Sequence, residues 1–292
     1  MIQSELDFFE SLKAKSDKSV YLHVRGKNDS VYFVNEDLSA EIAQKGVKTV
    51  VVRSFVFSLL YVIIFRSHFH ILNLNRGWLS LFSENTFMYL HGMPQQQMSL
   101  VRYHYINLLY TIASVRCLAV IGVSKMVISD WLAKYAKTEG EQAYLIHNKI
   151  PKVFMDRMQG LKSRERSVDF IYIGRCTEGK NINLICMVFD ILSSLGYRCE
   201  IYGFPKVLSC HYMGPLSYPD GVAECFSKAK SFISLNQYEP FGLTVVEAHA
   251  AGCFVFATKN TGALEVMESS DYQILDENNN PHQIVQEILT LN

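Results

Sequence analysis

The chain has 292 residues, 49% of them hydrophobic, and its 28 Lys and Arg balance its 28 Asp and Glu. This length suits two domains of ordinary size. The zero net charge means that no net field favours nucleic acid or an anionic membrane as a partner. Seven cysteines without a C-x-x-C pair indicate reduced thiols and argue against a disulfide framework or a zinc site. The first ten residues lack the pattern of a signal peptide, so we expect a cytoplasmic protein.

Strands and helices are predicted to alternate through the first half of the chain. Residues 20–24 and 31–34 are expected to be strands joined by a hairpin across 26–30, and 36–45 a helix ended by Gly46. Further strands are expected at 47–52, 70–74, 87–90, 118–123 and 144–147, and further helices at 55–65, 98–115 and 125–137. Such alternation is typical of a mostly parallel sheet with helices on both faces.

The segment 55–65, F-V-F-S-L-L-Y-V-I-I-F, is almost wholly apolar and is flanked by Arg53 and Arg66. It is too short to cross a bilayer, which takes about 20 apolar residues. One interpretation, which we favour, is a helix buried in the sheet domain. The alternative is a surface helix that docks on a bilayer with both arginines at the headgroups, which would make the protein peripheral at the inner face of the membrane.

Residues 150–167 interrupt the alternation with Pro151 and a basic run of Lys162, Arg164 and Arg166, which we interpret as a solvated interdomain linker. Beyond it, strands are expected at 169–173, 200–202, 232–235, 254–257 and 272–275, with a short one near His211, and helices at 181–195, 219–228, 243–251, from 263 and from 281. We therefore predict a doubly wound domain at 1–149, a linker at 150–167 and a second doubly wound domain at 168–292.

Ligands of open parallel sheets bind beyond the carboxyl ends of the strands. In the second domain, the predicted strand ends carry the cations Arg175 and Lys180 and several glycines, among them Gly203 and Gly242. Cations can neutralise a diphosphate, and a glycine lets the backbone approach it closely. The sequence therefore predicts a diphosphate site at this edge.

The loop and helix after the predicted strand at 232–235 supply the rest of the predicted site. Phe241 and Gly242 precede a helix that begins at Leu243, and the first N–H groups of such a helix attract an anion. Glu239 lies just before this helix and Glu247 within it, eight residues apart. A carboxylate near a phosphate site repels the diphosphate, so we expect both carboxylates to accept hydrogen bonds from sugar hydroxyls. The pattern predicts a ligand that joins a polyol to a diphosphate.

The motif E-P-F-G-L-T-V-V-E-A-H-A-A-G, followed by a strand and T-G-A-L-E, closely resembles the donor site of the family-four retaining glycosyltransferases, the glycosyl transferases group 1. I-G-R-C-T-E-G-K-N and I-Y-G-F-P are similar to that family's diphosphate and base segments, with Tyr202 in place of a glycine. The resemblance covers residues 168–267 well and the first domain thinly. It implies the GT-B fold: two Rossmann-like doubly wound domains that face each other across a cleft, here with a shortened N-terminal domain on the acceptor side.

The same resemblance implies a role for each site residue. Arg175 and Lys180 would hold the donor diphosphate, Glu247 the ribose hydroxyls, and Glu239 the sugar that is transferred. The other donor contacts that it implies are Gly203 near the base and the backbone N–H groups of Phe241, Gly242 and Leu243. In the first domain, Y-L-H-G-M-P places His91 where the family has a histidine that faces the donor sugar. A structural role for His91 is the alternative.

The main interpretation is a retaining glycosyltransferase of polysaccharide biosynthesis. It would move a sugar from a UDP- or GDP-sugar to an acceptor hydroxyl on a glycan, a lipid-linked glycan or a small molecule. No metal ion and no further cofactor are expected. One alternative is a nucleotide-sugar epimerase or a phosphorylase on the same fold, and an epimerase would act on the donor without an acceptor. Another is a non-catalytic subunit that binds a glycan or a partner transferase.

Overall fold

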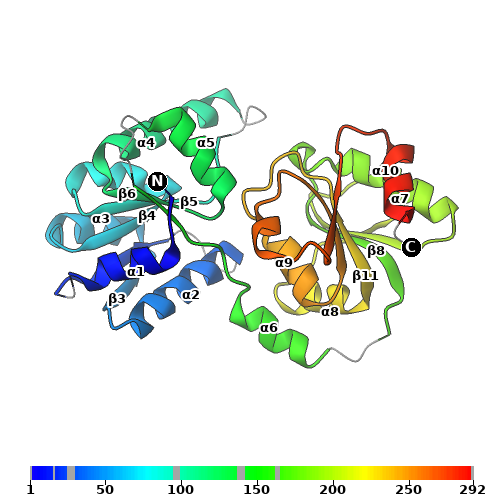
Figure 1. Ribbon diagram of the computed structural model, residues 1–292, viewed down its shortest axis with the longest axis horizontal. Coiled ribbons are helices and arrows are strands. Elements are labelled where there is room, and N and C mark those ends of the chain that lie inside the picture. The colour runs from blue at the N-terminus through cyan, green and yellow to red at the C-terminus, as the bar shows by residue number, and fades with distance from the viewer. Residues whose placement is uncertain are drawn as a thin grey trace. The chain divides into compact units, whose positions relative to one another are not determined.

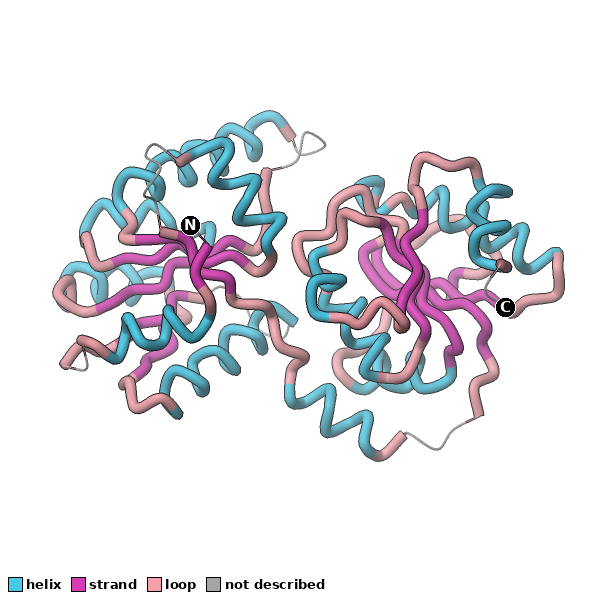
Figure 2. Tube along the Cα trace, in the orientation of Figure 1, coloured by secondary structure: helices cyan, strands magenta, loops and turns pink. Residues whose placement is uncertain are grey.

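The computed structural model describes residues 2–15, 17–24, 30–94, 99–136, 142–161 and 165–290. The chain divides into two compact units, Met1–Lys149 and Ile150–Asn292, and each is built on its own sheet (Figure 1). Figure 2 shows each sheet in magenta with cyan helices on both faces. The prediction of two doubly wound α/β units is therefore confirmed.

The first unit contains, among its described residues, a seven-stranded sheet in the order β1-β7-β6-β5-β4-β2-β3, and each neighbouring pair is parallel. The strands are β1 (Ile2–Gln3), β2 (Val20–His23), β3 (Thr49–Val52), β4 (Phe69–Asn73), β5 (Thr86–Leu90), β6 (Ala119–Gly122) and β7 (Ala143–Leu145). The helices are α1 (Glu5–Lys13), α2 (Ser30–Gln44), α3 (Phe55–Ile64), the 3-10 helix η1 (Leu74–Phe82), α4 (Leu100–Arg116) and α5 (Lys125–Tyr135). Right-handed crossovers place α1 and α2 on one face of the sheet and α3, η1, α4 and α5 on the other.

The predicted hairpin across 26–30 is wrong, because residues 31–34 belong to α2 and β2 pairs with β3 and β4 instead. V-Y-F-V taken alone has the composition of a strand. Val34, Leu38 and Ile42, however, follow one another at helical spacing, and all three are buried. Burial of this helical face outweighs the local strand propensity. Residues 26–29 of the predicted turn lie outside the described part of the chain.

The prediction of a buried helix for the apolar segment is also wrong. In α3 only Ser58 and Val62 are buried, whereas Phe57 is 57% exposed and Ile64 is 65% exposed. A helix that is apolar on all sides can be fully buried only if neighbours cover each side, and here α3 packs against η1 and β2 and leaves its other sides exposed. Within the described ranges, no helix is long and apolar enough to cross a bilayer.

The second unit contains a six-stranded sheet in the order β10-β9-β8-β11-β12-β13, again with parallel neighbours. Its strands are β8 (Val168–Arg175), β9 (Cys199–Phe204), β10 (Tyr212–Gly214), β11 (Ala229–Ser234), β12 (Phe254–Thr258) and β13 (Tyr272–Leu275). Its helices are α6 (Lys152–Gln159), η2 (Glu178–Lys180), α7 (Ile182–Ser194), α8 (Asp220–Lys228), α9 (Leu243–Ala250), η3 (Gly262–Val266) and α10 (Pro281–Leu289). α7 packs against α10 on one face, and α8 and α9 cover the other.

The core of the second unit lies between the sheet and the pair α7 and α10. Ile185 and Phe189 of α7 and Ile284 and Ile288 of α10 are fully buried there against Ile201 of β9. These apolar positions recur three or four residues apart in each helix, so one stripe of each helix meets the sheet. The packing fixes β8, β9 and β11, whose carboxyl ends carry the candidate site.

The segment predicted as a linker contains α6, which packs against α8 within the second unit. At its far end Arg166 is not solvated as predicted. Its guanidinium donates a hydrogen bond of 2.6 Å to the carbonyl of Ala251, just past the end of α9, and another to the carbonyl of Ala229. Carbonyl groups left free at the end of a helix attract a cation, which accounts for the contact. Lys162 and Arg164 lie outside the described residues.

Candidate functional site

Two glycines bring β8 and β9 together at their carboxyl ends. Gly203 of β9 has φ +152°, and a Cβ atom built there would lie 1.8 Å from the carbonyl oxygen of Gly174 in β8. No side chain fits at position 203. The next pair in the register is Arg175 with Phe204, so the exposed Arg175 side chain leaves the sheet directly beside this close approach. The predicted base segment and the first predicted cation are therefore neighbours.

The second predicted cation, Lys180, lies at the end of η2 and forms an ion pair with Glu239. Both side chains are largely shielded, with 16% of Lys180 and 14% of Glu239 exposed. The amide of Asn236 donates to the same carboxylate oxygen of Glu239 at 2.7 Å. The residue predicted to hold the diphosphate and the residue predicted to contact the sugar thus meet in one hydrogen-bonded pair.

The loop that carries Glu239 is tied to the loop after β12. The N–H of Glu239 donates to the carbonyl of Asn260 at 2.9 Å, and the N–H of Gly262 donates to the carbonyl of Glu239 at 3.0 Å. The hydroxyl of Thr258 donates to the carbonyl of Asn236 at 2.6 Å. These bonds act on the main chain at and just before the carboxylate. They hold the main chain of Glu239 on a fixed frame.

Asn181 joins the loop after β8 to the end of β11. It has φ +50°, a left-handed conformation that asparagine tolerates better than most residues. Its side-chain amide donates a hydrogen bond of 2.7 Å to the carbonyl of Leu235. The bond fixes Lys180, the preceding residue, close to the strand end that leads to Glu239.

Gly242 begins α9 and lies against Glu239. Its φ is +95°, and a Cβ atom there would come within 2.9 Å of Cγ of Glu239 and 3.0 Å of Val245. α9 then starts at Leu243, and the first N–H groups of a helix have no partner within it. Phe241 is buried and its carbonyl accepts from the N–H of Ala263 at 2.6 Å, which fixes the entry to the helix. The start of α9, the Lys180–Glu239 ion pair and Gly242 are therefore adjacent.

Glu247 lies one turn further along α9 in a different environment. Its side chain is 1% exposed, and the hydroxyl of Tyr218 donates to its carboxyl group at 2.9 Å. Burial raises the pKa of Glu247 to about 8, because the charged form loses its water and Tyr218 restores only part of that stabilisation. At neutral pH this carboxyl group is mostly protonated, so it can both donate and accept a hydrogen bond.

The comparisons with known proteins agree with this geometry. Residues 155–291, which include every site residue of the second unit, match the family described as "Glycosyl transferases group 1". The second unit is a glycosyl transferases group 1 domain. The resemblance seen in the sequence and the prediction of a glycosyltransferase are thereby confirmed at the level of the family. A search of curated proteins found no match.

Solved structures share the fold of both units of this glycosyltransferase. Sucrose-phosphate synthase from Thermosynechococcus elongatus is 14% identical with a TM-score of 0.67, over 94% of this chain and 90% of that one. HepE from Anabaena, in complex with UDP and glucose, is 10% identical with a TM-score of 0.63, over 94% and 89%. TarM is 16% identical with a TM-score of 0.60 over 80% of this chain, which spans 50% of TarM. Identities this low show the fold alone, and they confirm the predicted GT-B fold.

His91, the predicted site residue of the first unit, follows the end of β5. Its Nε2 lies 2.6 Å from Oδ1 of Asn73, and its ring lies 4.2 Å from that of Tyr89. Burial lowers the pKa of His91 to about 4, so the imidazole is neutral at pH 7. Nδ1 is buried without a hydrogen-bond partner in the described structure. The roles predicted for His91 and for the donor-site residues remain predictions.

Sequence reasoning missed a buried polar network in the first unit that runs from the carboxyl end of β2 into β4. Nε2 of His23 in β2 lies 3.0 Å from Nδ1 of His70 in β4, and both rings are buried. Burial lowers the pKa of His23 to about 2 and that of His70 to about 4. The amide of Asn73 bridges to this pair by donating to the carbonyl of His23 at 2.9 Å. The sequence signal that could have revealed this network was a histidine in each of two predicted strands, His23 and His70. In the second unit, Tyr218, the partner of Glu247, was likewise missed.

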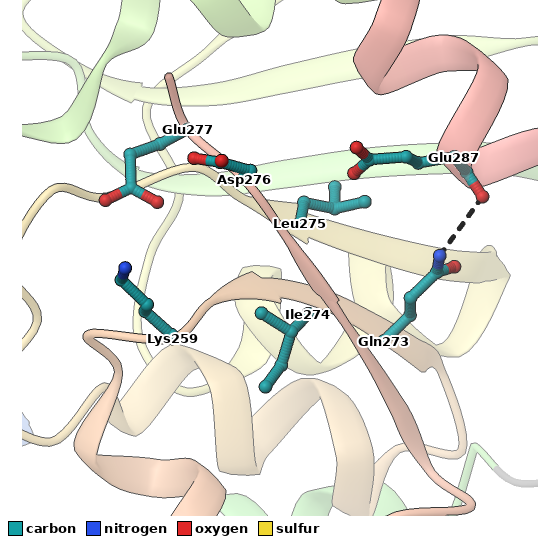
Figure 3. A pocket seen from close by; sticks show the side chains of 7 residues that line it. All are labelled: Lys259, Gln273, Ile274, Leu275, Asp276, Glu277 and Glu287. Carbon is teal, nitrogen blue, oxygen red and sulfur yellow. Dashed lines mark hydrogen bonds between the residues drawn. The ribbon is translucent and has the colours of Figure 1, made fainter. Parts of the chain in front are cut away.

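Two further features of the glycosyltransferase domain are formed by other residues. A pocket of about 250 Å³ at the end of β13 is lined by Lys259 but also by Asp276, Glu277 and Glu287 (Figure 3). Its acidic lining does not suit a diphosphate. Asp190, Cys210 and His211 place donor atoms within 4.8 Å of one another, a set that could hold a metal ion. No predicted donor residue belongs to that set.

Proposed function

We propose that the protein is a retaining glycosyltransferase that takes its sugar from a nucleotide diphosphate sugar. The observation that carries the proposal is the ion pair of Lys180 and Glu239 against Gly242, at the start of α9. A cation, a carboxylate and a helix start in contact offer one group for the phosphate charge and one for the sugar hydroxyls, side by side.

Donor binding would exchange the partners of this pair. Lys180 turns from Glu239 to the diphosphate, and Glu239 then accepts hydrogen bonds from the sugar. Arg175, exposed at the end of β8, supplies a second cation. Since the bond from the anomeric carbon to the diphosphate oxygen breaks during transfer, both cations and the helix start stabilise the negative charge that develops on the leaving group. Neither a metal ion nor a further cofactor enters this scheme.

Glu247 would bind the ribose of the donor. A buried carboxyl group beside the Tyr218 hydroxyl can exchange hydrogen bonds with a pair of vicinal hydroxyls. A hydroxyl pair that satisfies these buried groups is favoured over a ligand that leaves them unpaired. HepE is a structural neighbour solved with UDP-glucose, which supports a UDP-sugar as the first donor to test.

Retention of configuration is supported by the family match. In the front-face reaction that we propose, the acceptor hydroxyl attacks the face from which the diphosphate leaves, and the hydroxyl proton passes to a diphosphate oxygen. Glu239 and the neutral imidazole of His91 would contact the sugar as positive charge develops on its ring. The acceptor is a hydroxyl of a glycan, a lipid-linked glycan or a small molecule, in a pathway of polysaccharide synthesis. All seven cysteines are free, which supports a cytoplasmic location.

The experiment is a thermal-shift screen of the full chain against UDP- and GDP-sugars, followed by product analysis with and without acceptor sugars. A raised melting temperature with one donor, and product only when an acceptor is present, is the expected result. An epimerised donor without acceptor would instead identify an epimerase. Binding without any turnover would favour a non-catalytic subunit. A chain that no nucleotide diphosphate stabilises would refute the proposal.

A further inference from the structure

An apolar surface lies on the first unit where α3 meets η1. We call it the α3–η1 face; its exposed members are Phe55, Val56, Phe57, Leu60, Ile63 and Ile64 of α3 and Leu81 and Phe82 of η1. Aromatic contacts make it continuous. The ring of Phe55 lies 5.7 Å from that of Trp78 in η1, and Trp78 lies 5.9 Å from Phe82. Monomeric proteins rarely expose so many large apolar side chains in one place without a partner.

The scaffold under this face is firmly held. Arg76 of η1 is buried, and its guanidinium donates to the carbonyl of Ser54 at 3.0 Å and to that of Arg53 at 2.7 Å. Ser54 caps α3 by accepting from the N–H of Phe57, and Val62 anchors the opposite side in the core. The apolar side chains are therefore exposed on a helix whose position is fixed, and their exposure is not a consequence of loose packing.

Charge distribution indicates what covers the face. Between Glu41 and Asp130 the sequence has eight Lys or Arg and a single acidic residue, Glu84, although the whole chain has no net charge. Arg66 lies exposed after α3 and Arg102 lies exposed on α4, which packs against η1, whereas Arg53 before α3 pairs with Glu36 at 2.6 Å. An apolar surface with a basic surround is complementary to an anionic lipid surface, because side chains enter the acyl boundary while arginines meet phosphate headgroups.

We propose that the α3–η1 face binds the surface of a bilayer that contains anionic phospholipid. α3 has 10 residues and so cannot cross the hydrocarbon core, which means that it lies in the plane of the interface. The first unit is the acceptor side by resemblance. If the proposed function holds, on which this one step rests, docking selects the lipid-linked glycan among the three acceptor classes.

The test is flotation of the full chain with vesicles of phosphatidylcholine alone and of phosphatidylcholine mixed with phosphatidylglycerol. We expect binding to the mixed vesicles and weak binding to the neutral ones. The double variant Phe57→Ser with Ile64→Ser should lose binding. The matched control is Met187→Ser with Leu195→Ser, which removes two exposed apolar side chains from the second unit and should bind as the native chain does.

A second pair of variants tests the charge. Arg66→Gln should weaken binding to the mixed vesicles about fivefold, which corresponds to one arginine near an anionic surface. Lys228→Gln in the second unit should leave it unchanged. Failure to bind mixed vesicles, or equal binding by the Phe57 and Ile64 variant, would overturn the proposal. So would a native chain that sediments as a dimer when that variant sediments as a monomer, because the face would then join two copies.

These readouts are independent of the donor site. Calorimetric affinity for a nucleotide diphosphate should be the same in the native chain and in every vesicle-binding variant. A chain that binds vesicles but no nucleotide would refute the proposed function and leave the bilayer surface standing. A chain that binds nucleotide but no vesicles would refute the bilayer proposal and leave the proposed function standing.

Discussion

The two units share one architecture but place opposite chemistry at the carboxyl ends of their strands. In the second unit, the strand ends carry the Lys180–Glu239 ion pair and the buried carboxyl group of Glu247. In the first unit, they carry imidazoles, His23 at the end of β2 and His91 after β5, whose pKa values burial lowers to about 2 and about 4. The shared fold thus does not determine which ligand binds. The side chains that follow each strand determine the ligand.

One unit offers charge and the other offers neutral polar groups. A diphosphate needs cations, whereas a sugar ring needs hydrogen bonds that do not repel a developing positive charge. The difference between the units therefore supports a donor diphosphate on the second. The donor-site motifs of the sequence also lie in the second unit.

The largest effect is expected at the close approach of β8 and β9. Gly203→Val should destabilise the second unit by about 3 kcal/mol or more, because the new Cβ atom would overlap the carbonyl of Gly174. Gly160→Ala is the matched control, since a Cβ atom there has its nearest neighbour at 3.8 Å. Urea unfolding of both variants checks the difference. A Gly203 variant as stable as the control would show that the two strands can separate at no cost.

Removal of a cation should come next. Lys180→Ala and Arg175→Ala should each weaken nucleotide diphosphate binding about 10- to 100-fold, since a hydrogen bond to a charged group contributes roughly 1.5–3 kcal/mol. Lys230→Ala removes an exposed cation of the same unit, whose ion pair with Asp169 has little energetic weight. That variant should bind as the native chain does. Unchanged affinity in both site variants would place the diphosphate elsewhere.

The raised pKa of Glu247 predicts a pH dependence. Because the folded-state pKa is about 8 and the ordinary value is 4.5, stability relative to Glu247→Gln is fully present below pH 4.5 and is lost as pH rises toward 8. The loss amounts to at most about 1.4 kcal/mol per pH unit in that window. Thermal melts of both proteins from pH 5 to 8 provide the measurement. Parallel curves would mean that Glu247 is ionised in the folded chain.

The smallest effect on binding is expected in the first unit. His91→Gln should leave the affinity for nucleotide diphosphate unchanged and lower turnover about tenfold, as for the loss of one neutral hydrogen bond. Steady-state rates with the preferred donor, combined with nucleotide titration, separate the two effects. If nucleotide affinity fell as far as it does in Lys180→Ala, the contrast between the units would fail.

The candidate site of the second unit could be predicted from the sequence because it is assembled from short segments. Glu239, Gly242 and Glu247 lie within nine consecutive residues, and Arg175 and Lys180 within six. Their strands and helices set the geometry locally, so residue types and spacing were enough. Tyr218 escaped notice because it meets Glu247 from a distant loop.

The first unit was less predictable because contacts between residues far apart in the sequence determine its structure. Residues 31–34 have strand composition, and only the burial of Val34, Leu38 and Ile42 along one helical face shows that they continue a helix. For α3, the apolar sequence is compatible with the core and with the surface. Its position depends on Arg76, which holds the start of the helix from 22 and 23 residues away. Neither contact leaves a local pattern in the sequence.

We propose that the Lys180–Glu239 pair exchanges its partners for a donor. Calorimetric titration of nucleotide diphosphate into Glu239→Gln and Glu247→Gln tests this exchange. Glu239→Gln frees Lys180 from its competing carboxylate, so this variant should bind the free nucleotide at least as tightly as the native chain while transfer is lost. Glu247→Gln should weaken nucleotide binding, because it alters the ribose contact. If Glu239→Gln loses nucleotide affinity and Glu247→Gln keeps it, the donor lies in the opposite orientation and the proposed exchange is refuted.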